Sequence, residues 1–186
     1  MKKIRILFLT MVFFLGGCGM FPSSQNTVAE DAKYSTYYRA VSRNEKWKDG
    51  SFYYSLSAQM IRLDDGSYRF YIFLDQARVA MYDIAVLAVM NDIAYPDATM
   101  MMPNIGIMGK NTYTMIPNQY DPENGFVKGL VLSGESTEAS VDLKLLVEWK
   151  DKALEHVNRE FIRFTLTEEG WTSSGDPQDV IKGAEA

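Results

Sequence analysis

The stretch FYYSLSAQMIRLDDGSYRFYIFL, residues 52–74, decides the fold of this chain. Apolar and more polar side chains alternate along residues 52–60 and again along residues 68–74, which is the period of a half-buried β-strand. Between the two runs stands Asp64-Asp65-Gly66, and an Asp-Gly pair between alternating segments is typical of a hairpin turn. The further oxygen ligands of a calcium loop are missing from this turn. The stretch therefore predicts an antiparallel β-hairpin.

More strands are expected on both sides of a loop-rich middle. Residues 84–90 are apolar on both faces, which indicates a central strand that is covered on each side. Prolines and glycines are scattered through residues 91–125, which predicts long loops there. Within these loops short strands are expected at residues 105–108 and 112–116, and three longer strands follow at residues 126–133, 141–149 and 157–167.

The number of strands and the turn spacing predict the fold class. Roughly six to eight strands with a turn signal about every ten residues are typical of an antiparallel β-sandwich. The immunoglobulin-like arrangement is one candidate, although the chain lacks the Cys…Trp…Cys core of true immunoglobulin domains. Before the strands, Tyr34, Tyr37, Tyr38 and Val41 stand at helical spacing, which favours a short helix within residues 32–47. An edge strand is the alternative for this segment.

The N-terminal segment has the layout of an export signal. Lys2, Lys3 and Arg5 precede an apolar run from Ile6 to Leu15, which is too short to span a membrane because a span needs about 20 apolar residues. The run ends in Leu15-Gly16-Gly17-Cys18, which resembles the lipobox of bacterial lipoproteins, where an aliphatic residue and two small residues precede a cysteine. The resemblance covers only residues 1–22 and implies nothing about the domain that follows.

The resemblance implies that residues 1–17 are removed and that the Cys18 thiol carries a diacylglycerol anchor. Each buried methylene contributes about 0.8 kcal/mol, so two or three acyl chains hold a protein durably at a membrane. Cys18 is the only cysteine, which leaves none for disulfides, metal ligation or nucleophilic catalysis. We then expect residues 18–31 to be the lipidated cysteine and a flexible tether, residues 32–172 to be the β-sandwich domain, and residues 173–186 to be a mobile tail.

The anchor predicts a location outside the cytoplasm. Gly19, in place of an aspartate after the cysteine, resembles lipoproteins sorted to the outer membrane of two-membrane bacteria; in a single-membrane organism the protein would lie on the outer face of the plasma membrane. Loss of Lys2, Lys3 and Arg5 changes the formal net charge from −5 to −8. Because no basic cluster remains, nucleic acid is not an expected partner.

Side chains that could carry chemistry are sparse. His156 is the only histidine and stands in a polar connection, so catalysis through it is not expected. Glu135, Glu138, Asp142 and Glu148 could supply the two carboxylates of a sugar hydrolase, but acids in such positions are typical of solvated strand faces. The sequence contains no glycine-rich phosphate loop of either common type. We therefore expect no cofactor, no metal and no enzymatic activity.

The run Met100-Met101-Met102, with Met108 and Met115 nearby, is the oddest local feature. Soft thioether ligands bind copper(I), and methionine also fills irregular gaps beside a sheet. Three consecutive residues of a strand cannot all point inward, so packing is the favoured interpretation.

These observations predict a membrane-anchored lipoprotein that acts as a protein-interaction or envelope-assembly module. The sheet edges and residues 91–125 are its expected contact surfaces. The alternative is a glycan-binding lipoprotein that uses exposed aromatic side chains of Tyr34, Tyr37, Tyr38 or Trp171. An envelope hydrolase and a copper-binding protein are further alternatives, which the sparse chemistry disfavours.

Overall fold

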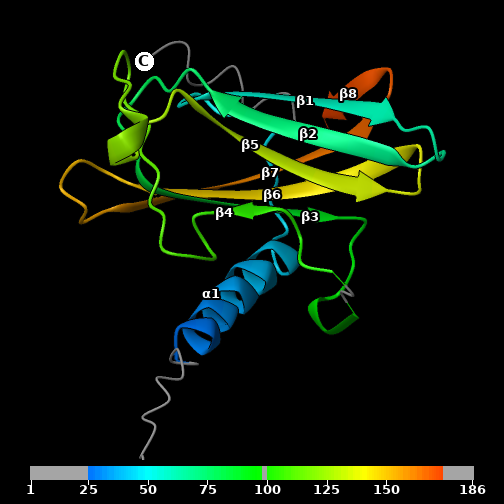
Figure 1. Ribbon diagram of the computed structural model, residues 1–186, viewed down its shortest axis with the longest axis horizontal. Helices are drawn as coiled ribbons and strands as arrows, with labels where there is room; N and C mark the ends of the chain where they lie inside the picture. Colours follow the sequence, from blue (N-terminus) through cyan, green and yellow to red (C-terminus); the bar gives the residue numbers. More distant parts are fainter. Residues whose placement is uncertain (1–24, 98–99, 174–186) are drawn as a thin grey trace, which may run out of the picture.

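The computed structural model describes residues 25–97 and 100–173, and there the chain forms an antiparallel β-sandwich with one long helix. This architecture confirms the predicted all-β class (Figure 1). The elements are α1 (Gln25–Ser42), β1 (Ser55–Arg62), β2 (Tyr68–Asp75), β3 (Tyr82–Met90), η1 (Tyr95–Asp97), β4 (Asn104–Ile105), η2 (Pro122–Asn124), β5 (Gly129–Ser136), β6 (Ser140–Lys150), β7 (Val157–Thr167) and β8 (Gly170–Ser173), where η marks a 3-10 helix. Cys18 and the predicted signal segment lie outside the described residues.

The strands form one sheet of three in the order β1-β2-β5 and one of five in the order β4-β3-β6-β7-β8. In the immunoglobulin arrangement the first, second and fifth strands share one sheet, and the third, sixth and seventh share the other. The strand order of this chain is the same for these six strands. β4 differs from the constant-type pattern, because it pairs with β3 instead of lying beside β5.

β1 and β2 form the hairpin that the sequence predicts, with Ser55 paired to Asp75 and Arg62 to Tyr68. In the turn, Gly66 takes a φ of 87°, a conformation that suits glycine. β1 begins three residues later than the alternation predicts. The reason is that the carbonyls of residues 53 and 54 accept hydrogen bonds from the main chain and the guanidinium of Arg78.

The helix α1 adds a third layer on the outer face of the five-stranded sheet (Figure 1). The four predicted positions, Tyr34, Tyr37, Tyr38 and Val41, are all buried against this face, so the helix interpretation is confirmed and the edge-strand alternative is wrong. β3 is apolar on both faces because both faces are covered. Val86 faces the sandwich core, whereas Leu87 faces the helix side.

The start of α1 differs from the prediction. The helix starts at Gln25, so residues 25–31 are helical and not part of a flexible tether, and it ends at Ser42, inside the stretch where a helix was expected. The tether was predicted from a polar stretch with Gly19 and Pro22 near its start, but no glycine or proline occurs between Pro22 and Gly50 to oppose a helix there. Figure 1 shows the first turns of α1 pointing away from the sandwich.

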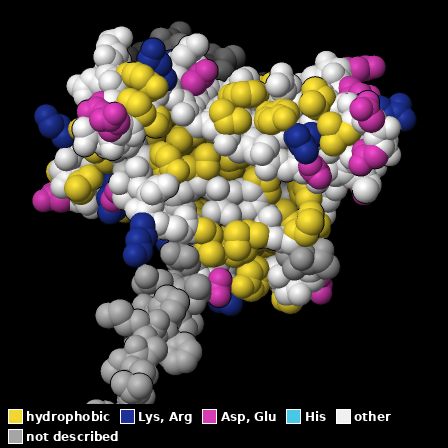
Figure 2. All heavy atoms as spheres, in the orientation of Figure 1, with side chains coloured by type: hydrophobic (Ala, Val, Ile, Leu, Met, Phe, Trp, Pro, Cys, Tyr) yellow, Lys and Arg dark blue, Asp and Glu magenta, His cyan; other side chains and the backbone are white. Residues whose placement is uncertain are grey.

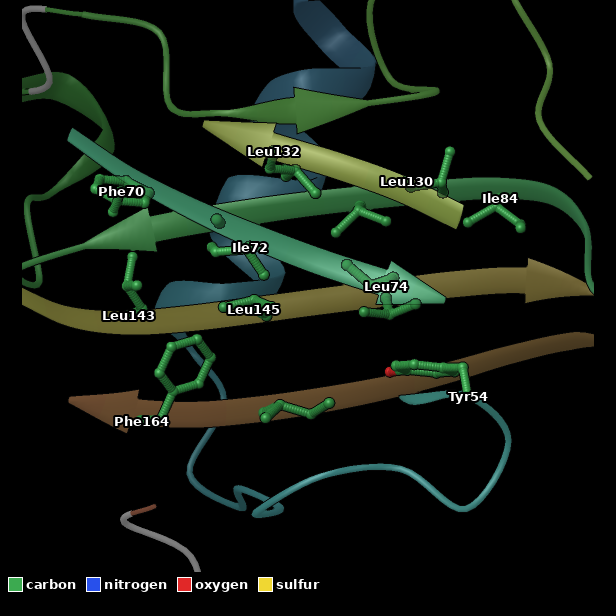
Figure 3. Packing of buried hydrophobic residues seen from close by; sticks show 14 of the residues in the cluster. Tyr54, Phe70, Ile72, Leu74, Ile84, Leu130, Leu132, Leu143, Leu145 and Phe164 are labelled. Carbon is green, nitrogen blue, oxygen red and sulfur yellow. The ribbon is translucent and has the colours of Figure 1, made fainter. Parts of the chain in front are cut away.

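The sandwich core lies between the two sheets (Figure 3). Ile72 of β2, Leu145 of β6 and Phe164 of β7 are fully buried and point toward one another across the layers. Each fully buried side chain of this kind contributes roughly 1.5–3 kcal/mol, which gives a chain without disulfides its stability. The alternating pattern of residues 141–149 and 157–167 was therefore a correct guide to β6 and β7.

Residues 91–125 contain less strand than predicted. β4 has only two residues, and residues 112–116 contribute isolated bridges, such as Met81 with Met115. Residues 126–128 precede β5 and instead pair with the loops, as in the hydrogen bond from the Val127 N–H to the Thr114 carbonyl at 2.9 Å. Among the described residues, no helix has the length and apolar character needed to cross a membrane.

Candidate protein-interaction surface

The aromatic residues proposed for glycan binding do not form an exposed platform. Tyr34, Tyr37 and Tyr38 lie beneath α1 and are at most 8% exposed. Trp171 is half-buried and meets the ring of Phe164 edge-on at 4.9 Å. The prediction of a sugar-binding surface on these four side chains is therefore wrong, because an amphipathic helix buried the tyrosines that the sequence left unplaced.

The methionines lie in different environments. Met102 is buried on the helix side of the five-stranded sheet, where its N–H donates to the Tyr34 hydroxyl at 2.8 Å, whereas Met115 belongs to the sandwich core. Met100 and Met101 are more than half exposed. Met108 is partly buried against the same helix-side cluster as Met102, so the surroundings of the buried methionines support packing.

The titratable candidates are also kept apart. His156 is 78% exposed at the turn between β6 and β7, with its Nδ1 atom 2.7 Å from the Asp151 carboxylate, and this contact lowers the pKa of Asp151. The four acids have separate partners: Glu135 binds Arg69, Glu138 accepts from Asn91, Asp142 binds Arg163 and Glu148 binds Arg159. The described residues contain no group of three or more His, Cys, Asp or Glu side chains suited to a metal ion.

A polar pocket of about 310 Å³ lies where α1 meets the edge of the five-stranded sheet. The Tyr37 hydroxyl donates to the Glu148 carboxylate, and burial together with this acceptor raises the pKa of Tyr37 well above its ordinary value. Across the pocket, Lys150 pairs with Asp83 at 2.7 Å, and this pairing raises the pKa of Lys150. Together with the hydrogen bond from the Lys33 ammonium to the Gly106 carbonyl at 2.7 Å, these contacts hold the helix to the sheet.

A second polar cluster is buried where the chain leaves α1. Lys48 pairs with Ile162 of β7 in a parallel bridge, and its Nζ atom lies 2.9 Å from Glu160, which is only 3% exposed. The second Glu160 carboxylate oxygen and the hydroxyl of Tyr54 have no hydrogen-bond partner among the described residues. Burial, followed by the neighbouring Glu160 carboxylate, raises the pKa of Tyr54 well above 10. The ion pair fixes the connection between α1 and β1 to the sandwich.

The outer edge of β3 is closed by the loops. Its Ile84 and Ala88 N–H groups donate to the carbonyls of Tyr113 and Pro103, each at 2.9 Å, and between them Val86 pairs with Ile105 of β4. At the start of the strand, Met81 and Met115 exchange two hydrogen bonds. Residues 91–125, which we expected to be contact surfaces, thus satisfy the backbone of β3.

The outer edge of β5 is open. β5 pairs with β2 on one side, and on the other side no backbone group of residues 129–136 is hydrogen-bonded to any part of the chain that the structure describes. Val131 is 52% exposed, and residues 129–134 carry no charged side chain. Native proteins usually protect such an edge with lysine, proline or a bulge, because unpaired strands attract other strands.

A cleft of about 660 Å³ continues from the beginning of β5. Val127 and Lys128, which lead directly into the strand, line it together with Ile116 and Tyr120. Tyr120 is 60% exposed, and the Lys128 ammonium lies 5.0 Å from the centre of its ring. The cleft therefore offers an apolar wall, an exposed aromatic side chain and a positive charge at one end of the open edge.

Sequence reasoning named sheet edges as contact surfaces but did not identify which edge. The strand order that leaves β5 unpaired depends on tertiary pairing and is not encoded in the alternation. The absence of charge was no guide either, since residues 129–134 of β5 and residues 55–61 of the opposite edge strand β1 both lack charged side chains. The Cys18 prediction lies outside the described residues and stays a prediction.

No family model matches this chain, and comparisons with curated proteins and with solved structures likewise give no match.

Proposed function

We propose that this protein is a lipid-anchored extracytoplasmic protein whose β-sandwich binds another protein or holds part of an envelope assembly. The observation that carries the interaction role is the unpaired outer edge of β5, which the chain itself leaves uncovered among its described residues. The anchor rests on Leu15-Gly16-Gly17-Cys18 and on the absence of any other cysteine. An anchored domain with an unprotected strand edge suits recognition of another polypeptide.

The direction of α1 is compatible with such an anchor. Its first turns point away from the sandwich, so the described part of the chain begins on the helix side (Figure 1). The open edge of β5 belongs to the other sheet of the sandwich. A partner on β5 would therefore not displace α1.

The anchor is tested by the substitution Cys18→Ser in intact cells. We expect loss of lipid labelling and either release of the protein from the membrane fraction or accumulation of the unprocessed precursor. A matched control is Ser23→Ala, which changes a neighbouring hydroxyl residue without touching the motif. Continued lipid labelling of the Cys18→Ser protein would show that the anchor proposal is wrong.

The interaction role is tested by cross-linking in intact cells followed by mass spectrometry. A photoreactive residue at Ser133, which is exposed on β5, should capture a defined protein. The same residue at Ser57, exposed on β1 at the far side of the same sheet, is the control. Equal capture at both positions, or reproducible absence of any specific product at Ser133, would count against the proposal.

A further inference from the structure

The three-stranded sheet lacks a strand beside β5 that the immunoglobulin arrangement would supply. In the constant-type pattern the fourth strand lies next to the fifth, whereas here β4 has moved across to β3. On this side of the molecule the five-stranded sheet therefore extends farther than the three-stranded sheet, because β4 continues it beyond β5 (Figures 1 and 3). We call this offset between the two sheet edges the step. The side chain of Pro103 fits under the strand, 3.0 Å from where a Cβ atom on Gly134 would lie.

The step leaves part of the sandwich core without cover. Ile105, Tyr113 and Val127 pack against the buried core but remain partly exposed to solvent. Figure 2 shows hydrophobic side chains gathered between the two sheets on the side of the molecule that faces the viewer. A strand paired with β5 would place every second side chain over these residues, and it would satisfy the free backbone groups of the edge.

The middle of β5 carries no charged side chain, but charged residues stand near both ends of the strand. Glu123 in η2, shortly before β5, and Glu138, just after it, are exposed and form no ion pair within the described residues. The net charge of the whole chain is −5. At the first end Lys128, directly before Gly129, offsets Glu123, so the charges favour a partner segment with a basic residue at the end that lies beside Glu138.

A single extended segment fits this step better than a second copy of the chain. Two copies that met through β5 would also bring their β4 edges together, so both layers of the sandwich would have to fit against each other at once. A lone strand has no second layer and meets no such obstacle. Its end could continue past Gly129 into the cleft beside Tyr120.

We infer that the open edge of β5 is a strand-addition site for an extended segment of another protein, with alternating apolar residues and a basic residue at the end that lies beside Glu138. This inference deepens the proposed function by naming the surface and the chemistry of its partner. The segment would complete the three-stranded sheet as a fourth strand and would cover Ile105 and Val127. Main-chain hydrogen bonds would supply affinity, and the exposed core residues would select apolar side chains.

The test uses the purified full chain and a fluorescent peptide about eight residues long. In this peptide valine and threonine alternate, and one end carries a lysine. We expect saturable binding by fluorescence anisotropy, and binding should weaken at least about tenfold when alternate peptide nitrogens are methylated, since these can no longer donate hydrogen bonds. A peptide of the same composition without alternation, and one with a glutamate in place of the terminal lysine, should also bind more weakly.

Matched substitutions locate the site. Val131→Lys on β5 and Ile105→Lys on β4 should each weaken binding of the lysine-ended peptide at least about tenfold, whereas Ile61→Lys on the opposite edge strand β1 should leave it unchanged. Because Ile105→Lys changes a partly buried residue, a photoreactive residue at Val131 gives a second readout in a chain whose core is intact. It should cross-link to the peptide, and the same group at Ile61 should not.

Several results would overturn the inference. They are absence of peptide binding, equal loss with Ile61→Lys, or binding only after removal of residues 174–186, which would assign the edge to the chain's own terminus. A dimer that dissociates with Val131→Lys would assign it to a second copy. These outcomes are distinct from failure of the membrane anchor, because peptide binding by the purified chain does not depend on Cys18, and Cys18→Ser does not alter the edge.

Discussion

The outer edges of β3 and β5 lie on the same side of the sandwich, yet only the backbone groups of the β3 edge are hydrogen-bonded to other described residues. Residues 103–115 close the edge of β3: the carbonyls of Pro103 and Tyr113 accept hydrogen bonds from the strand, Met115 exchanges two with Met81, and the short strand β4 pairs between them. The edge of β5 has no backbone partner among the described residues. The difference shows that a long connection in this chain protects one edge of the five-stranded sheet while leaving the adjacent edge of the three-stranded sheet available.

The closed edge also depends on the helix layer. The Met102 N–H donates to the hydroxyl of Tyr34, and the hydroxyl of Tyr38 donates to the carbonyl of Ile93 at 2.5 Å, so two tyrosines of α1 hold the connection that follows β3. The β5 edge has no such support from α1, which lies on the far face of the other sheet. We call residues 103–115 the cap of β3. Substitutions in this cap should therefore change the free energy of unfolding by very different amounts from substitutions on the open edge of β5.

The largest effect is expected at Gly106, where the cap bends against β3. Its φ is 68°, and a Cβ atom there would lie 2.1 Å from the Ile84 carbonyl oxygen. Gly106→Ala should lower the free energy of unfolding by about 3 kcal/mol, as measured by urea denaturation, because both the backbone conformation and the space exclude a side chain.

Gly109→Ala is the matched control, since Gly109 has a φ of 83° but open space around it. Its cost should be only about 1 kcal/mol. If both variants lost the same free energy of unfolding, the close approach of Gly106 to β3 would contribute nothing to the cost. The loops would then pack less closely against the β3 edge than the contacts indicate.

Native-state hydrogen exchange should separate the two edges directly. The amides of Ile84 and Ala88 are bonded to the cap, whereas the β5 amides that point away from β2 have no acceptor among the described residues. We expect the two β3 amides to exchange at least about 100-fold more slowly than the outward amides of β5. Similar protection of both sets would break the comparison, since it would require a partner for β5 within the chain.

The sequence predicted individual strands well, but it did not predict how the strands pair or what covers them. The alternation in residues 68–74 and 141–149 correctly marked β2 and β6, because one face of each is buried in the sandwich core and the period of two is preserved. The apolar residues of β3 correctly indicated cover on both sides. The cover itself, a helix on one face and a sheet on the other, depends on contacts far apart in the chain.

The failures have physical causes too. Tyr34, Tyr37 and Tyr38 were considered as exposed ligand-binding rings, yet helical spacing places all three on the side that meets the sheet. Residues 112–116 satisfy β3 through isolated bridges, which leave no alternating pattern to recognise. Which strand remains at an open edge follows from the pairing order, and local sequence does not determine that order.

Alkaline pH should weaken the closed side by a smaller amount. Burial, chiefly, raises the pKa of Tyr38 to about 12, above the ordinary value of 10. The folded state therefore keeps this proton longer than the unfolded state, so its stabilising effect is complete below pH 10 and is lost as pH rises toward 12. We expect a loss of about 1 kcal/mol over this range, after allowance for screening by solvent.

Urea denaturation at several pH values, with tyrosinate absorbance as a second signal, measures this effect. Tyr38→Phe removes the titrating group and should make the unfolding free energy less dependent on pH between 10 and 12, although the variant also loses the hydrogen bond to Ile93. An unchanged pH dependence in this variant would show that other buried tyrosines, such as Tyr54, account for the loss.

The smallest effect is expected on the open edge. Val131 is 52% exposed, whereas its neighbour Leu132 is 2% exposed and faces the core. Val131→Lys should change the free energy of unfolding by less than about 0.5 kcal/mol, since a lysine on a free strand edge finds water and no clash. Leu132→Ala on the same strand should cost roughly 2–5 kcal/mol and serves as the control that β5 is part of the folded core. If Val131→Lys instead cost as much as a core substitution, the exposed side of β5 would already be covered in the isolated chain, and the contrast with β3 would disappear.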